Sequence, residues 1–252
     1  MRRPEPDREP NPSRAERPEP ASDRREQVND LDRSYRLNAR EMQLLTTVGS
    51  FRTVAVQDLS EPQVRNLLRA ELMEKKTVYP RRNGQPLEVL VLTDRGRSLL
   101  QSQQPIADRQ RYYARLAKPN EIEHDAAIYR AYLKAKEEIE AKGGTVDRVV
   151  LDYELKSIIN RDMNRAGAGT AAERRKALAE DLDLKIVGDK LPLPDLRVEY
   201  TDQDGREQHE DLEIVTRHYR SAHMAGKAAA GFSLVNADGA RSKVIDDHHH
   251  RY

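Results

Sequence analysis

The sequence predicts an α+β protein with two ordered domains behind a disordered N-terminal tail. Three observations indicate this fold class. The first 26 residues hold six of the 13 prolines, with seven basic and seven acidic residues and almost no apolar side chain. Helical patterns and a hairpin signal follow, and then a long helix precedes several strand-like segments. The length of 252 residues suits two domains of ordinary size.

The composition is polar, with 35% charged and 37% hydrophobic residues, so part of the chain is not expected to enter a core. The net charge of +1 means that any nucleic-acid site must be a local basic patch. The absence of cysteine excludes disulfides and thiolate metal sites and favours a reducing compartment. No apolar run approaches the roughly 20 residues that span a bilayer, and the N-terminus lacks a signal-peptide core. We therefore expect a cytoplasmic protein with no membrane partner.

Residues 1–36 are expected to form the disordered tail. Their charged, proline-rich part cannot bury enough apolar surface to offset the entropy that is lost on ordering. A tail that binds a partner is the alternative. At the other end of the chain, residues 238–252 are expected to be frayed.

Residues 37–105 begin with three helical patterns. Asn38 is a helix cap, and apolar residues recur at near-helical spacing over the turns that follow it. A second, short helix or turn is expected between residues 51 and 59. Ser60, followed by a Glu-Pro pair, starts the third helix. The apolar stripe of this helix comprises Val64, Leu67, Leu68, Leu72 and Met73.

A basic hairpin and a closing helix complete this first domain. Two strand-like runs, residues 77–79 and 87–92, flank an Asn-Gly dipeptide, which is typical of tight hairpin turns. A Thr-Asp pair then opens another helix. Three helices, a hairpin and a closing helix form the element order of a winged helix-turn-helix, which we predict over residues 37–105.

The predicted winged helix is expected to bind double-stranded DNA. A helix-turn-helix places its second helix in the major groove, where Arg, Asn and Gln side chains reach base edges and phosphates. The helix that starts at Ser60 takes this recognition position. On this helix and at the wing tip, the candidate DNA-binding residues are Gln63, Arg65, Asn66, Arg69, Arg81 and Arg82. Arginines are also common on solvated helices, and a winged helix used for protein contacts or dimerisation is the alternative.

The second domain, residues 106–237, is predicted to combine a linker helix with a small α/β fold. Apolar residues at helical spacing, a Gly-Gly stop and alternating strand patterns indicate its elements. In order, these are a helix (119–142), a strand (146–151), a charged helical stretch (153–183), two strands (194–201 and 209–216), a helix (221–230) and a strand (231–235).

Two acidic residues are expected to meet on neighbouring strands of this domain. Alternation along the first of the two paired strands places Asp195 on its polar face, and alternation along the next strand does the same for Glu213. Paired carboxylates bind a hard cation such as Mg²⁺ or Mn²⁺, which can activate water. Solvated acidic residues on edge strands are the alternative.

This arrangement resembles the PD-(D/E)xK nuclease superfamily, in which a helix and a strand precede a Pro-Asp strand and an acidic strand. The resemblance implies that Asp195 and Glu213 are catalytic metal ligands and that Glu123 is an accessory carboxylate. The family pattern has a Lys two residues after the Glu, whereas Val215 stands there in this chain. Lys227, on the following helix, could place its ammonium group in the same site. Without a Lys, the fold could persist without cleavage.

The two halves together resemble the replication-relaxation family of plasmid and mobile-element proteins over roughly residues 37–235. The resemblance rests on the segments Leu37-Asn38-Ala39-Arg40-Glu41, Leu92-Thr93-Asp94-Arg95-Gly96, Glu123-His124-Asp125, Pro194-Asp195 and Leu212-Glu213-Ile214. It implies a role in replication, relaxation or transfer, with a DNA-binding half and a nuclease-like half.

We therefore expect a DNA-binding protein whose metal-dependent cleavage is weak or absent. The alternative is a winged-helix transcriptional regulator whose second domain binds a partner or an effector and cleaves nothing. A structural adaptor is a third class. A homodimer and complexes with replication or transfer proteins stay open as assemblies.

Overall fold

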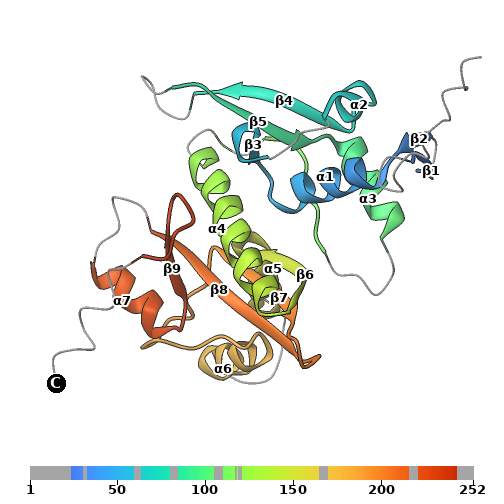
Figure 1. Cartoon of the computed structure of the whole chain (residues 1–252). Coiled ribbons are helices and arrows are strands. Elements are labelled where there is room, and N and C mark those ends of the chain that lie inside the picture. Colours follow the sequence, from blue (N-terminus) through green and yellow to red (C-terminus); the bar gives the residue numbers. More distant parts are fainter. Residues whose placement is uncertain are drawn as a thin grey trace, which may run out of the picture.

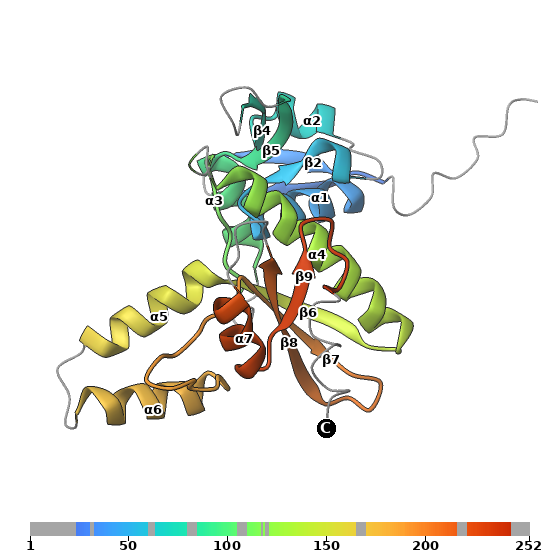
Figure 2. The same ribbon diagram turned by 90° about the vertical axis from the view of Figure 1, so that its left-hand side faces the viewer.

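The computed structural model describes residues 24–30, 33–59, 64–79, 85–104, 110–116, 118, 121–164, 170–215 and 221–242. These residues form a mixed α+β fold, as the sequence predicts. Figures 1 and 2 show an N-terminal lobe (described residues 24–116) and a C-terminal lobe (described residues 121–242), with helix α4 (Ile122–Ala141) running between them. Within the described residues, no helix is both long and apolar enough to cross a membrane.

The N-terminal lobe contains a three-stranded antiparallel sheet surrounded by helices. Its elements are β1 (Glu26–Asn29), β2 (Ser34–Leu37), α1 (Ala39–Ser50), β3 (Val54–Ala55), the 3₁₀ turn η1 (Val56–Asp58), α2 (Val64–Arg69), β4 (Met73–Val78), β5 (Leu87–Leu92) and α3 (Asp94–Gln103). The strand order of the larger sheet is β3-β5-β4, and β1 pairs with β2 in a separate hairpin.

Local capping signals place α1 and α3 where the sequence predicts them, whereas Ser60, the predicted start of the third helix, lies outside the described residues. Asn38 and Glu41 form a reciprocal capping box at the start of α1, with the Asn38 carboxamide oxygen 2.8 Å from the Glu41 backbone nitrogen. Thr93 caps α3 by accepting the backbone N–H of Gly96 at 3.0 Å. These side chains satisfy amide groups that the first helical turn leaves without a partner.

Two segments of the N-terminal lobe differ from the sequence-based expectation. The apolar stripe predicts Leu72 and Met73 in the third helix, but Glu71 adopts a φ of 56° beyond the end of α2, and Met73 begins β4. Leu72 and Met73 are buried in the structure, and a longer helix would have buried them too. Apolar spacing alone therefore does not distinguish the end of a helix from the start of a strand. Strands β1 (26–29) and β2 (34–37) pair as a hairpin, although the composition predicts a tail as far as residue 36.

The C-terminal lobe is a four-stranded mixed sheet with helices around it. Its further elements are β6 (Thr145–Leu151), α5 (Asp152–Asn164), α6 (Ala171–Asp181), β7 (Leu196–Thr201), β8 (Glu207–Val215), α7 (Ser221–Ala229) and β9 (Ser233–Asn236). The strand order is β6-β7-β8-β9, with antiparallel pairing except between β8 and β9, which are parallel. Helix α7 provides the crossover that parallel pairing requires. Beyond β9, Arg241 pairs with Glu138 of α4 at 2.6 Å, in a segment that the sequence predicts to be frayed.

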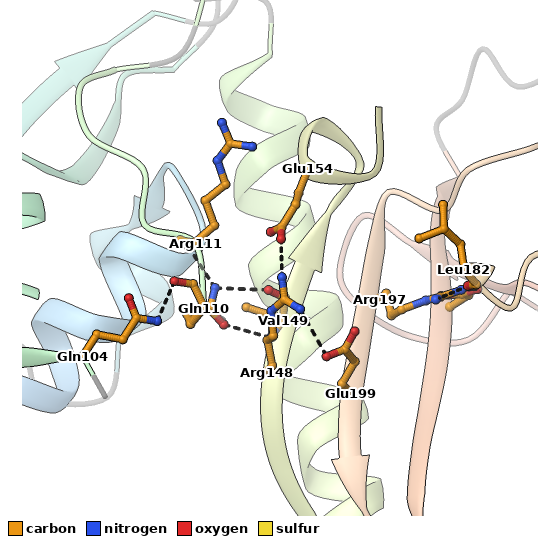
Figure 3. A network of polar contacts seen from close by, with 10 residues as sticks. Gln104, Gln110, Arg111, Arg148, Val149, Glu154, Leu182, Arg197 and Glu199 are labelled. Atoms are coloured by element: carbon orange, nitrogen blue, oxygen red, sulfur yellow. Dashed lines mark hydrogen bonds and ion pairs between the residues drawn. The ribbon is translucent and has the colours of Figure 1, made fainter. Parts of the chain in front are cut away.

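One hydrophobic core runs through both lobes. It includes Phe51 after α1, Tyr129 on α4 and Val198 on β7. The rings of Phe51 and Tyr129 have centroids 5.1 Å apart. At the edge of the second sheet, the Gln110 side chain bonds to both the backbone N–H and the carbonyl of Val149 in β6, as Figure 3 shows. This side chain takes the place of a further strand at that edge and ties the connecting segment to the sheet.

Candidate functional site

Helix α2 presents two arginines to solvent. Arg65 and Arg69 are exposed, while Leu67 between them is fully buried in the core. Neither arginine forms an ion pair with a described residue. Asn66 is half-buried, and its side-chain amide donates to the backbone carbonyl of Arg36 at 3.3 Å. The helix therefore offers unpaired positive charge, and the predicted base-reading role of Asn66 competes with this structural hydrogen bond.

The remaining predicted DNA-binding residues, Gln63, Arg81 and Arg82, lie outside the described residues. In the described part of the adjoining hairpin, the cations are paired. Lys75 lies 2.8 Å from Glu88, and Lys76 lies 2.8 Å from Glu74. Tyr79, which follows β4, is 64% exposed. Tyr79 is not among the predicted DNA-binding residues. Its position next to Pro80-Arg81-Arg82, at the predicted wing tip, was the sequence signal that could have identified it.

A second group of polar side chains forms where β7 begins and β8 ends. The register pairs Leu196 with Leu212, and its continuation by one residue brings Asp195 opposite Glu213, as the alternation predicts. The Asp195 carboxylate accepts the backbone N–H of Ile214 at 2.9 Å. This hydrogen bond holds Asp195 against β8 beside Glu213.

Lys227 reaches this site from helix α7. Its ammonium group donates to the Glu213 carboxylate at 2.8 Å and to the Leu193 carbonyl at 2.6 Å. The Glu213 side chain is only 2% exposed and the Lys227 side chain 14% exposed. Because a buried carboxylate is costly without a compensating charge, this pair accounts for both buried groups. The structure thus brings Lys227 to Glu213, an arrangement that the sequence leaves open.

His124 supplies a fourth side chain, which is not among the predicted site residues. Its Nε2 lies 3.3 Å from Asp195. Burial opposes protonation of His124, but the hydrogen bond to Asp195 and nearby carboxylates outweigh it and raise the histidine pKa. Glu123, the proposed accessory carboxylate, is exposed instead. The two residues are adjacent, and helical spacing does not specify which of them reaches a neighbouring strand end.

The other charged residues on this face of the sheet are bound to one another. Arg197 forms a two-pronged ion pair with Asp211, at 2.7 and 2.9 Å, and donates to the Leu182 carbonyl. Figure 3 shows the Arg197 side chain extending to Leu182, and Arg148 lying between Glu154 and Glu199. Asp195, Glu213, Lys227 and His124 are also paired with one another, but they gather where β7 begins and β8 ends and include the two predicted metal ligands, so they form the candidate site.

The candidate site offers two carboxylates to a cation. Within the described residues, no group of three or more His, Cys, Asp or Glu side chains is placed to hold a metal ion. Mg²⁺ nevertheless keeps several waters in proteins and is often bound by one or two carboxylates together with substrate phosphates. The donor chemistry of Asp195 and Glu213 fits such an ion, which would compete with His124 and Lys227 for their oxygens.

Comparison of the chain with known protein families, with curated proteins and with solved structures gives no match.

Proposed function

We propose that this chain is a DNA-binding protein whose residues 37–105 bind duplex DNA as a winged helix. One observation carries the proposal. The element order α1, β3, η1, α2, β4, β5, α3, with strand order β3-β5-β4, is that expected of a winged helix in which the short turn η1 precedes the recognition helix, and α2 in the recognition position exposes Arg65 and Arg69. Arginines that have no carboxylate partner in the described part of the chain are available to phosphates and base edges.

We further propose that the C-terminal lobe is a relative of the PD-(D/E)xK nucleases. The order α4, β6, β7, β8, α7, β9, with β9 parallel to β8, supports this relationship, and α5 and α6 then form an insertion between the first two strands. Asp195 and Glu213 stand at the family's acidic positions, and Lys227 approaches from α7 in place of the missing lysine at Val215.

Asp195 and Glu213 would hold Mg²⁺ or Mn²⁺ in such a site. The bound ion would supply an activated water and charge stabilisation for phosphodiester hydrolysis. Lys227 would balance the charge of a phosphate brought close to Glu213, and His124 would orient Asp195 through its 3.3 Å contact. The resemblance to the replication-relaxation family supports a role in replication, relaxation or transfer of a plasmid or mobile element.

A transcriptional regulator without cleavage is the second candidate function. The observation that favours it is that both carboxylates already have cationic partners, Lys227 for Glu213 and His124 for Asp195. A metal ion entering the site must displace or rearrange these contacts. Weak or absent cleavage is therefore the expected outcome.

Duplex binding is tested by measuring the affinity of the full chain over a range of salt concentrations. Each phosphate contact contributes a log–log slope of about −0.9, so binding should weaken steeply with salt. Replacing Arg65 and Arg69 together by Gln should flatten the slope by up to about 1.8 if both contact phosphates. Arg161→Gln with Arg206→Gln, at two exposed arginines of the C-terminal lobe, removes the same charge as the matched control and should leave the slope unchanged. Binding that is absent or independent of salt overturns the proposal.

The same proteins, incubated with supercoiled plasmid and Mn²⁺, separate the two candidate functions. Nicking that is lost in Asp195→Asn but retained in Asp204→Asn, a change in the exposed β7–β8 turn, assigns cleavage to this site. Nicking that survives Asp195→Asn places the active centre elsewhere. If the chain binds duplex DNA but does not nick the plasmid, and if Mn²⁺ does not change the melting temperature of the protein, the chain is the non-cleaving regulator.

A further inference from the structure

The β1–β2 hairpin has one apolar face and one polar face. Val28 and Tyr35 lie opposite each other and pack against the core of the N-terminal lobe. The other face carries two cross-strand pairs, Gln27–Arg36 and Asn29–Ser34. Hydrogen bonds link its neutral side chains, including one of 2.6 Å between the Ser34 hydroxyl and Asn29. Neither of these two pairs contains a carboxylate, and beyond them Asp30 lies opposite Arg33, to which its backbone is hydrogen-bonded.

The hairpin is attached to all three helices of its lobe. Asn66 of α2 donates to the Arg36 carbonyl, and Gln103 of α3 donates to the Asn29 carbonyl at 2.7 Å. Arg25 pairs at 3.0 Å with Glu41, which is itself part of the cap of α1. The hydrogen bond from Asn66 places β2 beside α2. In the sequence, Asn66 lies between the exposed Arg65 and Arg69. The hairpin therefore has a defined position next to the proposed recognition helix.

The charge of the hairpin matches that of α2. Arg33, at the turn, and Arg36 are exposed, and neither forms an ion pair with a described residue. The lysines of β4 are, by contrast, paired with Glu74 and Glu88. In Figure 1 the hairpin lies at one end of the N-terminal lobe, and the far ends of β4 and β5 lie at the other. Unpaired positive charge thus continues from α2 onto the hairpin.

We infer that the β1–β2 hairpin is a second DNA-contacting element, in which Arg33 and Arg36 bind phosphates of the duplex on the side of α2 away from the β4–β5 hairpin. The inference rests on the proposed DNA binding and extends it to a segment outside the predicted winged helix. Phosphates are the fitting partner because Arg36 shares its face with neutral amide and hydroxyl donors, and Arg33 adds an exposed guanidinium group at the turn. Such contacts position the protein on DNA and do not read sequence.

The test uses the full chain with Arg33 and Arg36 both replaced by Gln. If both contact phosphates, the log–log salt slope of duplex binding should fall by about 1.8, and affinity for specific and unrelated duplexes should fall by the same factor. The α2 contact uses the Arg36 backbone, so the substitutions should leave the melting temperature unchanged. The control is Arg161→Gln with Arg206→Gln, which removes the same charge from two exposed positions of the C-terminal lobe.

Three outcomes overturn the inference. If the hairpin variant keeps the wild-type slope while the Arg65 and Arg69 variant loses it, the hairpin does not contact DNA and the proposed function stands. If the control pair flattens the slope equally, the effect is one of net charge. If the wild-type chain binds no duplex, both the inference and the proposed function fail.

Discussion

Asp125 illustrates how a single residue at the lobe junction is controlled by its surroundings. It lies on α4 with 3% of its surface exposed, and its carboxylate is 3.6 Å from the Arg52 guanidinium. Burial raises the pKa of Asp125 to about 6, although Arg52 and His124 act in the opposite direction. Glu121 and Asp152 add negative charge nearby and reinforce the increase.

Replacing Asp125 by Asn should change how stability depends on pH. The folded pKa of about 6 exceeds the ordinary value of 3.8, so the folded wild type binds more protons than the unfolded chain between these values. Wild-type stability therefore gains as pH falls through 6, and the variant lacks this gain. The difference in unfolding free energy, wild type minus variant, should rise by about 2 kcal/mol from pH 7 to pH 4.5. Urea denaturation at both pH values measures it, and a constant difference contradicts the assignment. Because Asp125 also helps to raise the pKa of His124, both proteins are compared in a His124→Gln background, which removes the titration of the histidine.

At the scale of the elements, the start of α3 depends on a close approach between helix and strand. A Cβ atom on Gly96 would lie 2.1 Å from the carbonyl oxygen of Leu72. Thr93 bridges the same place, because its hydroxyl donates to the Glu71 carbonyl at 2.7 Å and accepts the Gly96 N–H. The residue before β4 and the first turn of α3 are thus in direct backbone contact, which holds the proposed wing against its closing helix.

Gly96→Ala should destabilise the protein by about 3 kcal/mol, because the methyl group meets backbone that has no side-chain rotamer to relieve the clash. Gly226→Ala is the matched control, since Gly226 also lies in a helix but has nothing within 4 Å of the position that an alanine methyl group would take. This control should be stabilising by about 0.5–1 kcal/mol, because alanine loses less entropy in a helix. Thermal melting of the two variants compares them, and equal effects would show that the approach at Leu72 is not rigid.

At the scale of the whole molecule, the two lobes share one core. The chain has two phenylalanines, and they lie in different surroundings. Phe51 packs between Tyr129 and Tyr132 of α4, with ring centroids 5.1 and 4.7 Å away, at the lobe junction. Phe232 belongs to a separate small cluster with Leu184. A core that crosses the junction makes the lobes unfold together.

Phe51→Ala should therefore uncouple the lobes, whereas Phe232→Ala should not. Both side chains are almost fully buried, so each truncation should cost about 3–5 kcal/mol. Only Phe51→Ala should lower the urea m-value or produce a second transition, because only this change weakens packing between the lobes. The two equilibrium unfolding curves are the measurement. Identical m-values for the two variants would show that the junction does not transmit cooperativity.

Local signals in the sequence determined the mixed α+β class and most of the elements. Asn38 and Thr93 cap helices because their short polar side chains satisfy neighbouring amides, and Gly143, with a φ of 80°, follows α4 as the Gly-Gly pair predicts. Alternation along the two strands predicts that Asp195 and Glu213 share one face of the sheet, since side-chain direction in a strand repeats every two residues, and the register then sets them opposite each other. These signals act between near neighbours in the chain and are therefore readable without the fold.

Only the tertiary structure decided which distant groups meet. The β1–β2 hairpin is too short to be stable by itself and is held by α1, α2 and α3, so its own sequence gives little sign of it. His124 rather than Glu123 reaches Asp195 because the packing of α4 on the sheet sets the rotation of that helix. Lys227 meets Glu213 because the crossover through α7 returns the chain beside β8. Each of these contacts joins segments whose relative position depends on burial of the shared core, a property of the whole chain that no local pattern contains.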